Sequence, residues 1–357
     1  MRKVIVDKPG GFHRLRIDTV KDLEPGPGQV VVRTEAIGVN YADCIVRMGL
    51  YQSAKDFVGW PITPGFEFAG TVLSTGPGAS LWSPGQRVFG VTRFSGYATQ
   101  VCVDERQLFA LPDAFDMAQA ATFPVVFLTA YYALFELANI QRPVPNSDSD
   151  SPRRNQSTNI LVHSAAGGVG GALLQLGKLA GCRMVGVVGR SSKVESARTF
   201  GADEVIDKSR ENLWRGARCY APDGYDIVLD ANGAETLAKS YEHLGSPGKL
   251  VVYGFHSMLP RDTGKPNYLK LAVDFLRTPR FNPLDLTNDN KSVLAFNLSY
   301  LFHRHEILQE AMDSLLAWAA AGKLQAPPVQ TFPFDRVADA HRTIESGATV
   351  GKLALLP

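Results

Sequence analysis

Apolar and polar residues alternate in blocks along the second half of the chain. Short apolar runs predict strands at residues 159–163, 183–188, 204–206, 226–230 and 249–253. The segments between them carry apolar residues at helical spacing, as at residues 172–180 and 193–200. Strands that alternate with helices predict a parallel sheet covered on both faces, which is the doubly wound α/β architecture.

The first part of the chain has a different pattern of apolar and turn-forming residues. Residues 1 to about 124 read as β-rich, with strands at 29–39, 70–74 and 86–90 that are separated by glycine and proline turns. The last part predicts two more strands and two helices, at residues 293–298, 306–320, 337–345 and 352–356. The pattern therefore predicts a β-rich part and an α/β part.

Residues 143–158 are polar and contain almost no large apolar side chain. This composition predicts a mobile loop inserted into the α/β part. The run Ser151-Pro152-Arg153-Arg154 leaves a phosphorylation or partner site as the alternative.

Composition argues against several classes of protein. The 357 residues include 37 Lys and Arg against 35 Asp and Glu, so the net charge is +2 and no polycationic surface for nucleic acid is expected. No apolar run reaches the roughly 18 to 20 residues of a membrane-spanning helix, so we expect no integral membrane segment. The four cysteines are far apart and form no C-x-x-C pair, which suits a reducing, cytoplasmic compartment.

A glycine-rich turn follows the first predicted strand of the α/β part. A strand, such a turn and a helix are the parts of a dinucleotide site, because the helix N-terminus offers unpaired N–H groups to a pyrophosphate. The usual first glycine is replaced by alanine, so the match is imperfect. The residues predicted to contact the cofactor at this turn are Ala165, Gly167, Gly168, Val169 and Gly170.

The end of the next strand indicates which dinucleotide is bound. An acid is expected there for NAD, but the chain reads Gly189, Arg190, Ser191, Ser192 and Lys193. Two cations and two hydroxyls favour the 2′-phosphate of NADP(H). A serine-capped helix start explains the same residues as the alternative.

Two later strands end in turns at the same predicted edge of the sheet. These turns contain Asn232, Gly254 and Phe255. Ligands of such sheets bind beyond the carboxyl ends of the strands, so the turns are predicted to flank the nicotinamide. Ordinary turn chemistry is the alternative.

These motifs, in this order, resemble the medium-chain dehydrogenase/reductase superfamily, and within it the zinc-free quinone oxidoreductases of the zeta-crystallin group. The C-terminal part is similar to the vesicle amine transport protein branch. The resemblance rests on Gly38-Val39-Asn40-Tyr41-Ala42-Asp43 with Arg47, Gly49 and Tyr51, on residues 64–70 and 165–170, on Phe296-Asn297-Leu298, and on Val350-Gly351-Lys352.

The resemblance implies a GroES-like catalytic domain at residues 1–124 and 301–357, a Rossmann domain at 125–300, an active site between them and a homodimer. It implies that Asn40, Tyr51 and Thr129 line the catalytic cleft, and that Phe296 and Lys352 join the cofactor site. The alternatives are a packed aromatic for Tyr51 and a turn or interdomain bond for Asn40. We interpret Asp43 and Arg47 as a structural ion pair.

The resemblance also allows a test for zinc. The three ligand positions of zinc-dependent members are occupied here by Asn40, Phe66 and Val125, which cannot form the ligand set that zinc requires. We therefore expect no functional metal. Without a Lewis acid the acceptor must be easily reduced, such as a quinone or an activated enone, with the proton supplied by Tyr51 or by water. A trans-acting enoyl reductase of a biosynthetic pathway and a non-enzymatic NADPH-binding scaffold are the alternatives.

Overall fold

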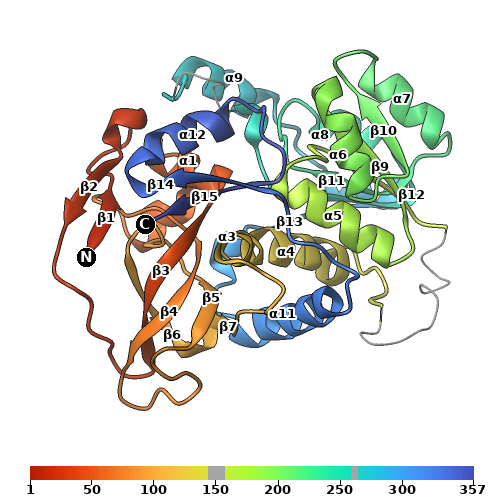
Figure 1. The fold of residues 1–357 in the computed structure, drawn as a ribbon. Coiled ribbons are helices and arrows are strands. Elements are labelled where there is room, and N and C mark those ends of the chain that lie inside the picture. Colours follow the sequence, from red (N-terminus) through yellow and green to blue (C-terminus); the bar gives the residue numbers. More distant parts are fainter. Residues whose placement is uncertain (144–156, 259–263) are drawn as a thin grey trace.

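The computed structural model describes residues 1–143, 157–258 and 264–357. The two predicted parts lie side by side, with the chain ends in the same part (Figure 1). Of the polar loop predicted at residues 143–158, residues 144–156 lie outside the described ranges.

The α/β part is a six-stranded parallel sheet in the order β10-β9-β8-β11-β12-β13. The order reverses between β8 and β11, which places the expected ligand crevice at their carboxyl ends. The strands are β8 (Asn159–Val162), β9 (Arg183–Val188), β10 (Glu204–Asp207), β11 (Tyr225–Asp230), β12 (Leu244–Val252) and β13 (Lys291–Ala295).

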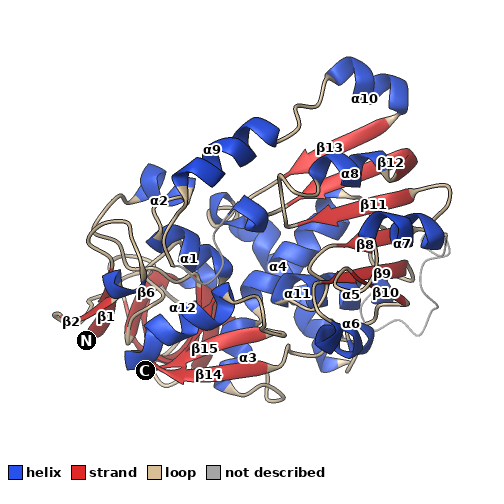
Figure 2. Cartoon of the chain, turned by 90° about the horizontal axis from the view of Figure 1, so that it is seen from above, coloured by secondary structure: helices blue, strands red, loops and turns tan. Residues whose placement is uncertain are grey.

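Both faces of this sheet are covered, as the apolar runs predict (Figure 2). Within β8, Ile160 and Val162 pack in the core that contains Leu173 of α5, whereas Leu161 packs in the core that contains Ala217 of α7. The helices of this part are α5 (Gly168–Leu179), α6 (Val194–Thr199), α7 (Leu213–Tyr220), α8 (Leu237–Glu242), α9 (Tyr268–Arg277) and α10 (Pro283–Asp289).

The β-rich part is a seven-stranded sheet in the order β14-β15-β3-β4-β5-β7, with β6 paired to β3. The last two strands of the chain therefore return to the sheet formed by the first hundred residues. The strands are β3 (Gln29–Val39), β4 (Glu67–Thr75), β5 (Arg87–Val91), β6 (Gln100–Asp104), β7 (Leu108–Ala110), β14 (Val329–Pro333) and β15 (Lys352–Leu356), and β1 (Arg2–Ile5) and β2 (Arg16–Thr19) form a separate ribbon.

Helices pack on the β-rich sheet, and some of them lie between it and the parallel sheet. Tyr131 and Trp318 pack α4 against α11 with ring centroids 6.2 Å apart. The helices are α1 (Tyr41–Arg47), α2 (Gln52–Phe57), α3 (Met117–Thr122), α4 (Pro124–Tyr131), a π-helical turn (Tyr132–Leu137), α11 (His305–Ala320) and α12 (Val337–Glu345). Single 3₁₀ turns occur at Phe12–Arg14, Glu105–Gln107, Ser191–Lys193, His256–Met258, Leu298–Tyr300 and Phe334–Arg336.

Several element boundaries differ from the predicted ones. The helix predicted from residue 172 begins at Gly168, because the glycine-rich turn itself supplies the first helical turn. The strand predicted at 249–253 begins at Leu244, and the strand predicted at 293–298 ends at Ala295, before the 3₁₀ turn at Leu298–Tyr300. Within the described ranges, no helix has the length and apolarity needed to cross a membrane.

Candidate active site

The glycine-rich turn lies between β8 and α5, with Gly167 as the extended N-cap of α5. A Cβ on Gly170 would lie 2.3 Å from the carbonyl oxygen of Ser164, so only glycine fits there. Ala165, which replaces the usual first glycine, is fully buried against Gly186 of β9, where a Cβ would lie 2.9 Å from its methyl group. The missing glycine is therefore compensated by a glycine on the neighbouring strand.

The same turn contacts the β-rich part. A Cβ on Gly168 would lie 2.8 Å from Cδ of Lys352, so the glycine makes room for the lysine stem. Gly167 forms a parallel bridge with Gly351, and the Gly351 N–H donates to the carbonyl of Ala166 at 3.2 Å. Val169 is half-buried in the first turn of α5. The cofactor turn is thus held in place from both parts of the molecule.

Arg190 and Lys193, the two residues predicted to bind the 2′-phosphate, contact backbone carbonyl groups of the residues that follow α12. Arg190 Nη2 donates to the Ser346 carbonyl at 3.1 Å, and Lys193 Nζ donates to the carbonyls of Gly347 at 2.8 Å and Thr349 at 2.6 Å. Burial, and then the neighbouring Arg190, lower the pKa of Lys193. The two cations lie together, as the sequence predicts, and both are hydrogen-bonded to backbone carbonyls.

Sequence reasoning missed an acid beside these cations. Asp207 ends β10 in register with Val188 of β9, so its carboxylate lies at the same edge of the sheet. It accepts hydrogen bonds from the hydroxyls of Ser191 and Ser209. Ser192 and Gly189 are exposed. The parallel register of the two strands was the signal that could have placed Asp207 here.

The turn after β11 is fixed by the buried carboxylate of Asp230, which accepts from the backbone N–H groups of Asn232 at 2.8 Å and Gly233 at 3.0 Å. Ser164 Oγ reaches Asn232 Oδ1 at 3.1 Å, which joins this turn to the glycine-rich turn. These contacts bring two of the predicted cofactor segments together. Gly254 and the exposed Phe255 follow β12 beside them.

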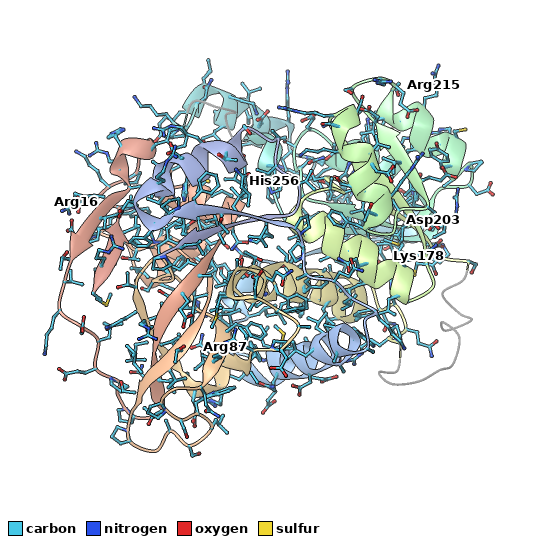
Figure 3. The ribbon with its side chains drawn as sticks, viewed as in Figure 1. Arg16, Arg87, Lys178, Asp203, Arg215 and His256 are labelled. Carbon is cyan, nitrogen blue, oxygen red and sulfur yellow. The ribbon has the colours of Figure 1, made fainter. Side chains whose placement is uncertain are left out.

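His256, which the sequence did not single out, lies where the two parts of the molecule meet (Figure 3). Its ring packs on Tyr41 of α1 with centroids 4.5 Å apart. Burial lowers the pKa of His256 to about 4. The imidazole is therefore neutral at physiological pH.

Asn40 is the centre of a buried network. Its Nδ2 donates to Glu67 Oε1 at 2.8 Å and its Oδ1 accepts from Lys352 Nζ at 2.7 Å. Lys352 Nζ also lies 2.8 Å from Glu67 Oε1 and 2.8 Å from the Val39 carbonyl oxygen. A lysine only donates and a carboxylate only accepts, so the orientation of the Asn40 amide is determined. The second Glu67 oxygen accepts from the Val125 N–H at 2.8 Å.

The network bears on the prediction for Lys352. Its three N–H groups have three protein acceptors, so in this structure the ammonium group serves Asn40 and Glu67 while its stem lies against Gly168. Lys352 therefore connects Asn40 and Glu67 to the glycine-rich turn.

Tyr51 lies on an aromatic wall formed with Phe66 and Phe94, at centroid distances of 5.6 and 6.3 Å. Its hydroxyl donates to Asn297 Oδ1 at 2.8 Å, and burial raises its pKa. Asn297 was part of the family resemblance but was not predicted as a site residue. The Tyr51 phenol is thus protonated, half-buried and bonded to Asn297.

Thr129 and Phe296 occupy the adjoining region. The Thr129 hydroxyl donates to the Val125 carbonyl one helical turn earlier at 2.6 Å, and Thr129 is buried. Phe296 packs on Tyr132 with ring centroids 4.9 Å apart.

The predicted ion pair between Asp43 and Arg47 is wrong. Arg47 instead pairs with Glu345 of α12 at 2.7 Å, with both side chains fully buried. Asp43 accepts from the backbone N–H groups of Asn40 and Gly65, each at 2.8 Å. Burial nevertheless raises the pKa of Asp43 to about 7. The two residues are one helical turn apart, but their partners come from other elements.

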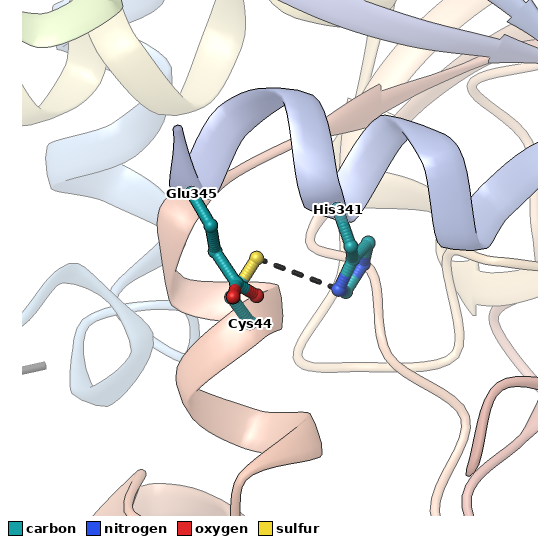
Figure 4. A group of neighbouring side chains, drawn as sticks. All are labelled: Cys44, His341 and Glu345. Atoms are coloured by element: carbon teal, nitrogen blue, oxygen red, sulfur yellow. Dashed lines mark hydrogen bonds between the residues drawn. The ribbon is translucent and has the colours of Figure 1, made fainter. Parts of the chain in front are cut away.

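Cys44, His341 and Glu345 form a buried cluster of potential metal ligands between α1 and α12 (Figure 4). Arg47 enters the same cluster, with Nη1 3.2 Å from His341 Nδ1 and Nη2 2.7 Å from Glu345 Oε1. Burial and then Glu345 raise the pKa of the Cys44 thiol. A guanidinium already bonded to two of the ligands and a protonated thiol do not suit a cation.

Comparison with known proteins identifies the family. An alcohol dehydrogenase GroES-like domain model matches residues 26–113, and a zinc-binding dehydrogenase model matches residues 200–355. The chain is 33% identical over 365 residues to the synaptic vesicle membrane protein VAT-1 homolog of Rattus norvegicus, covering 100% of this chain and 84% of the relative. The chain belongs to the medium-chain dehydrogenase/reductase superfamily.

Solved structures agree with this assignment and with the predicted fold class. The quinone oxidoreductase of Escherichia coli, solved in complex with NADPH, superposes with a TM-score of 0.83 at 26% identity and covers 100% of both chains. The human VAT-1 homolog-like protein superposes with a TM-score of 0.81 at 26% identity, covering 100% of this chain and 98% of that one. The name of the matching dehydrogenase model mentions zinc, whereas Asn40, Phe66 and Val125 are the residues predicted for the ligand positions.

Proposed function

We propose that this protein is an NADPH-dependent oxidoreductase that needs no metal and transfers a hydride to a quinone or an activated enone. The observation that carries the proposal is the Lys352–Asn40–Glu67 network at the predicted zinc position. Lys352 brings a fixed positive charge to Asn40, which is one of the three predicted ligand positions. The acceptor must therefore be one whose reduction needs only orientation and hydrogen bonding.

The residues of the chain fit an NADPH cofactor. Gly170 lets the first turn of α5 pack closely on the Ser164 carbonyl at the end of β8, and Arg190 and Lys193 supply two cations at the end of β9. The NADPH complex of the E. coli relative supports the choice of cofactor. When bound, NADPH would supply the hydride from its nicotinamide ring.

The remaining chemistry belongs to protein side chains. Asn40 is rigid and has a second amide N–H in addition to the one given to Glu67. Tyr51 can exchange its bond to Asn297 for a bond to the acceptor oxygen as that oxygen gains charge. Its raised pKa keeps the proton on the phenol until it is needed. Phe66 and Phe94 provide an apolar wall suited to a flat ring.

The test is a turnover screen with NADPH against a quinone, an enone and an enoyl thioester. We expect turnover with the quinone or the enone and a slower rate for Tyr51→Phe. Turnover with the thioester alone would instead indicate an enoyl reductase. Tight NADPH binding without any turnover would indicate a scaffold. The proposed homodimer and the cytoplasmic location are checked by sedimentation and by cell fractionation.

A further inference from the structure

Residues 346–352, which we call the strap, connect the end of α12 to the start of β15. In Figure 1 this part of the chain runs from α12 toward α5 before it enters β15. The carbonyls of Ser346, Gly347 and Thr349 accept hydrogen bonds from Arg190 and Lys193. The strap is thus attached to the nucleotide-binding part by the cations that would bind a 2′-phosphate.

The strap is attached by hydrogen bonds from cationic side chains to neutral backbone carbonyls. Two positive side chains lie together at the strap and meet neutral carbonyl oxygens. A phosphate group adds Coulomb attraction to both cations and can accept bidentate hydrogen bonds from the arginine, which neutral carbonyl oxygens do not offer. A 2′-phosphate that reaches Arg190 and Lys193 therefore competes with the strap carbonyls for the same N–H groups.

The other end of the strap reaches the catalytic network. The Gly351 N–H donates to the Ala166 carbonyl at 3.2 Å, and Lys352 holds Asn40 and Glu67. Thr349 and Lys352 are three residues apart, which is at most about 10 Å of extended chain. A change in the strap at Thr349 is therefore close enough to alter the position of Lys352.

We propose that the strap is a specificity-determining element that is displaced when the 2′-phosphate binds Arg190 and Lys193, and that it links this event to Lys352. The inference rests on the proposed NADPH function. Two opposing interactions then set the discrimination between NADPH and NADH. The 2′-phosphate attracts Arg190 and Lys193, and the strap carbonyls hold the same side chains by hydrogen bonds. Loosening the strap strengthens binding of the phosphorylated nucleotide alone.

Gly347→Ala tests the competition. Gly347 has φ +64, and a Cβ placed on it would have no neighbour within 4 Å, so the substitution strains the attached strap without a clash. The probes are adenosine 2′,5′-bisphosphate and AMP, with dissociation constants measured by calorimetry. We expect the variant to bind the bisphosphate roughly fivefold more tightly, from the strain of one left-handed residue, and AMP with unchanged affinity.

Gly28→Ala is the matched control, because Gly28 has φ +69 and likewise no neighbour within 4 Å, but lies in the turn before β3. The control should leave both affinities as in the wild type. An unchanged bisphosphate affinity in Gly347→Ala, or an equal change for AMP, would overturn the competition. The proposal would also be overturned if the wild type and the variant each bound the bisphosphate and AMP with the same affinity.

Hydrogen exchange in the wild type gives a second readout. The bisphosphate, but not AMP, should speed exchange of the amides of residues 347–351, and slower or unchanged exchange would contradict displacement. These outcomes are separate from the fate of the proposed function. A protein that shows them but turns over no quinone or enone retains the strap as a nucleotide sensor and loses the proposed reaction.

Discussion

The two ends of the predicted cofactor site are built in opposite ways. At the catalytic end, Asn40, Glu67 and Lys352 are buried and satisfy one another. At the adenosine end, Arg190 is exposed, Lys193 is half-buried, and both are bonded to backbone carbonyls. The difference favours our proposal of a rigid reaction centre and an adjustable recognition site, and each end should respond to perturbation accordingly.

The largest effect is expected at the rigid end. Lys352→Met leaves the Glu67 carboxylate buried without its cation, which should cost about 3–5 kcal/mol of unfolding free energy. The measurement is chemical denaturation. The double variant Lys352→Met with Glu67→Gln is the control, and it should recover much of the loss because no buried charge is left unpaired. A loss below about 1 kcal/mol in the single variant would show that the network is not a closed unit.

The adjustable end should be sensitive to charge. Arg190→Asp with Lys193→Glu should weaken NADPH binding by about a hundredfold and leave NADH binding much less affected. Nicotinamide fluorescence measures both dissociation constants, and the difference should shrink as salt is added. Arg215→Asp with Arg218→Glu, two exposed positions on α7, changes the net charge equally. If the control matches the test variant, long-range charge rather than a phosphate site explains the preference.

Sequence patterns predicted the local motifs of the site but not the contacts between residues that are far apart in the chain. The glycine-rich turn and the pair Arg190 and Lys193 are local features, so spacing and composition were enough to find them. The bond from Lys193 to the Thr349 carbonyl spans 156 residues, and the bond from Lys352 to Asn40 spans 312. Contacts of this length depend on how β15 returns to β3, which local periodicity does not contain.

Two further residues illustrate the same limit. Asp207 reaches the adenosine end only because β10 and β9 run in parallel register. Arg47 was paired with Asp43 by proximity on one helix, whereas its partner Glu345 comes from α12. The fold class and the family, by contrast, were predictable, because they rest on whole segments rather than on single side-chain contacts.

A smaller effect is expected for Tyr51, which lies at the edge of the rigid end. Tyr51→Phe should lower quinone turnover roughly tenfold to a hundredfold, because one hydrogen bond to the charged oxygen is worth about 1 to 3 kcal/mol. NADPH affinity should not change. Tyr241→Phe removes a surface hydroxyl bonded to Asp289 and serves as the control. Unaltered kinetics in Tyr51→Phe would assign the residue to packing.

The smallest effect is expected for pH. A phenol with a raised pKa keeps its proton throughout the neutral range, so turnover should vary less than about twofold between pH 7 and 9. It should fall only as the pH passes above the pKa of Tyr51. His256, whose pKa is lowered to about 4, is already neutral there and adds no inflection. A change in turnover centred near pH 7 would instead point to Asp43, because burial raises the pKa of that carboxyl to about 7 beside Asn40.

The most direct test of the central claim is quinone-dependent oxidation of NADPH and of NADH by protein dialysed against a metal chelator. The rigid, cation-filled reaction centre predicts full turnover after chelation. If Arg190 and Lys193 recognise the 2′-phosphate, kcat/KM for NADPH should be about a hundredfold above that for NADH. Activity that is lost on chelation and restored by zinc, or equal rates with the two cofactors, would contradict the account.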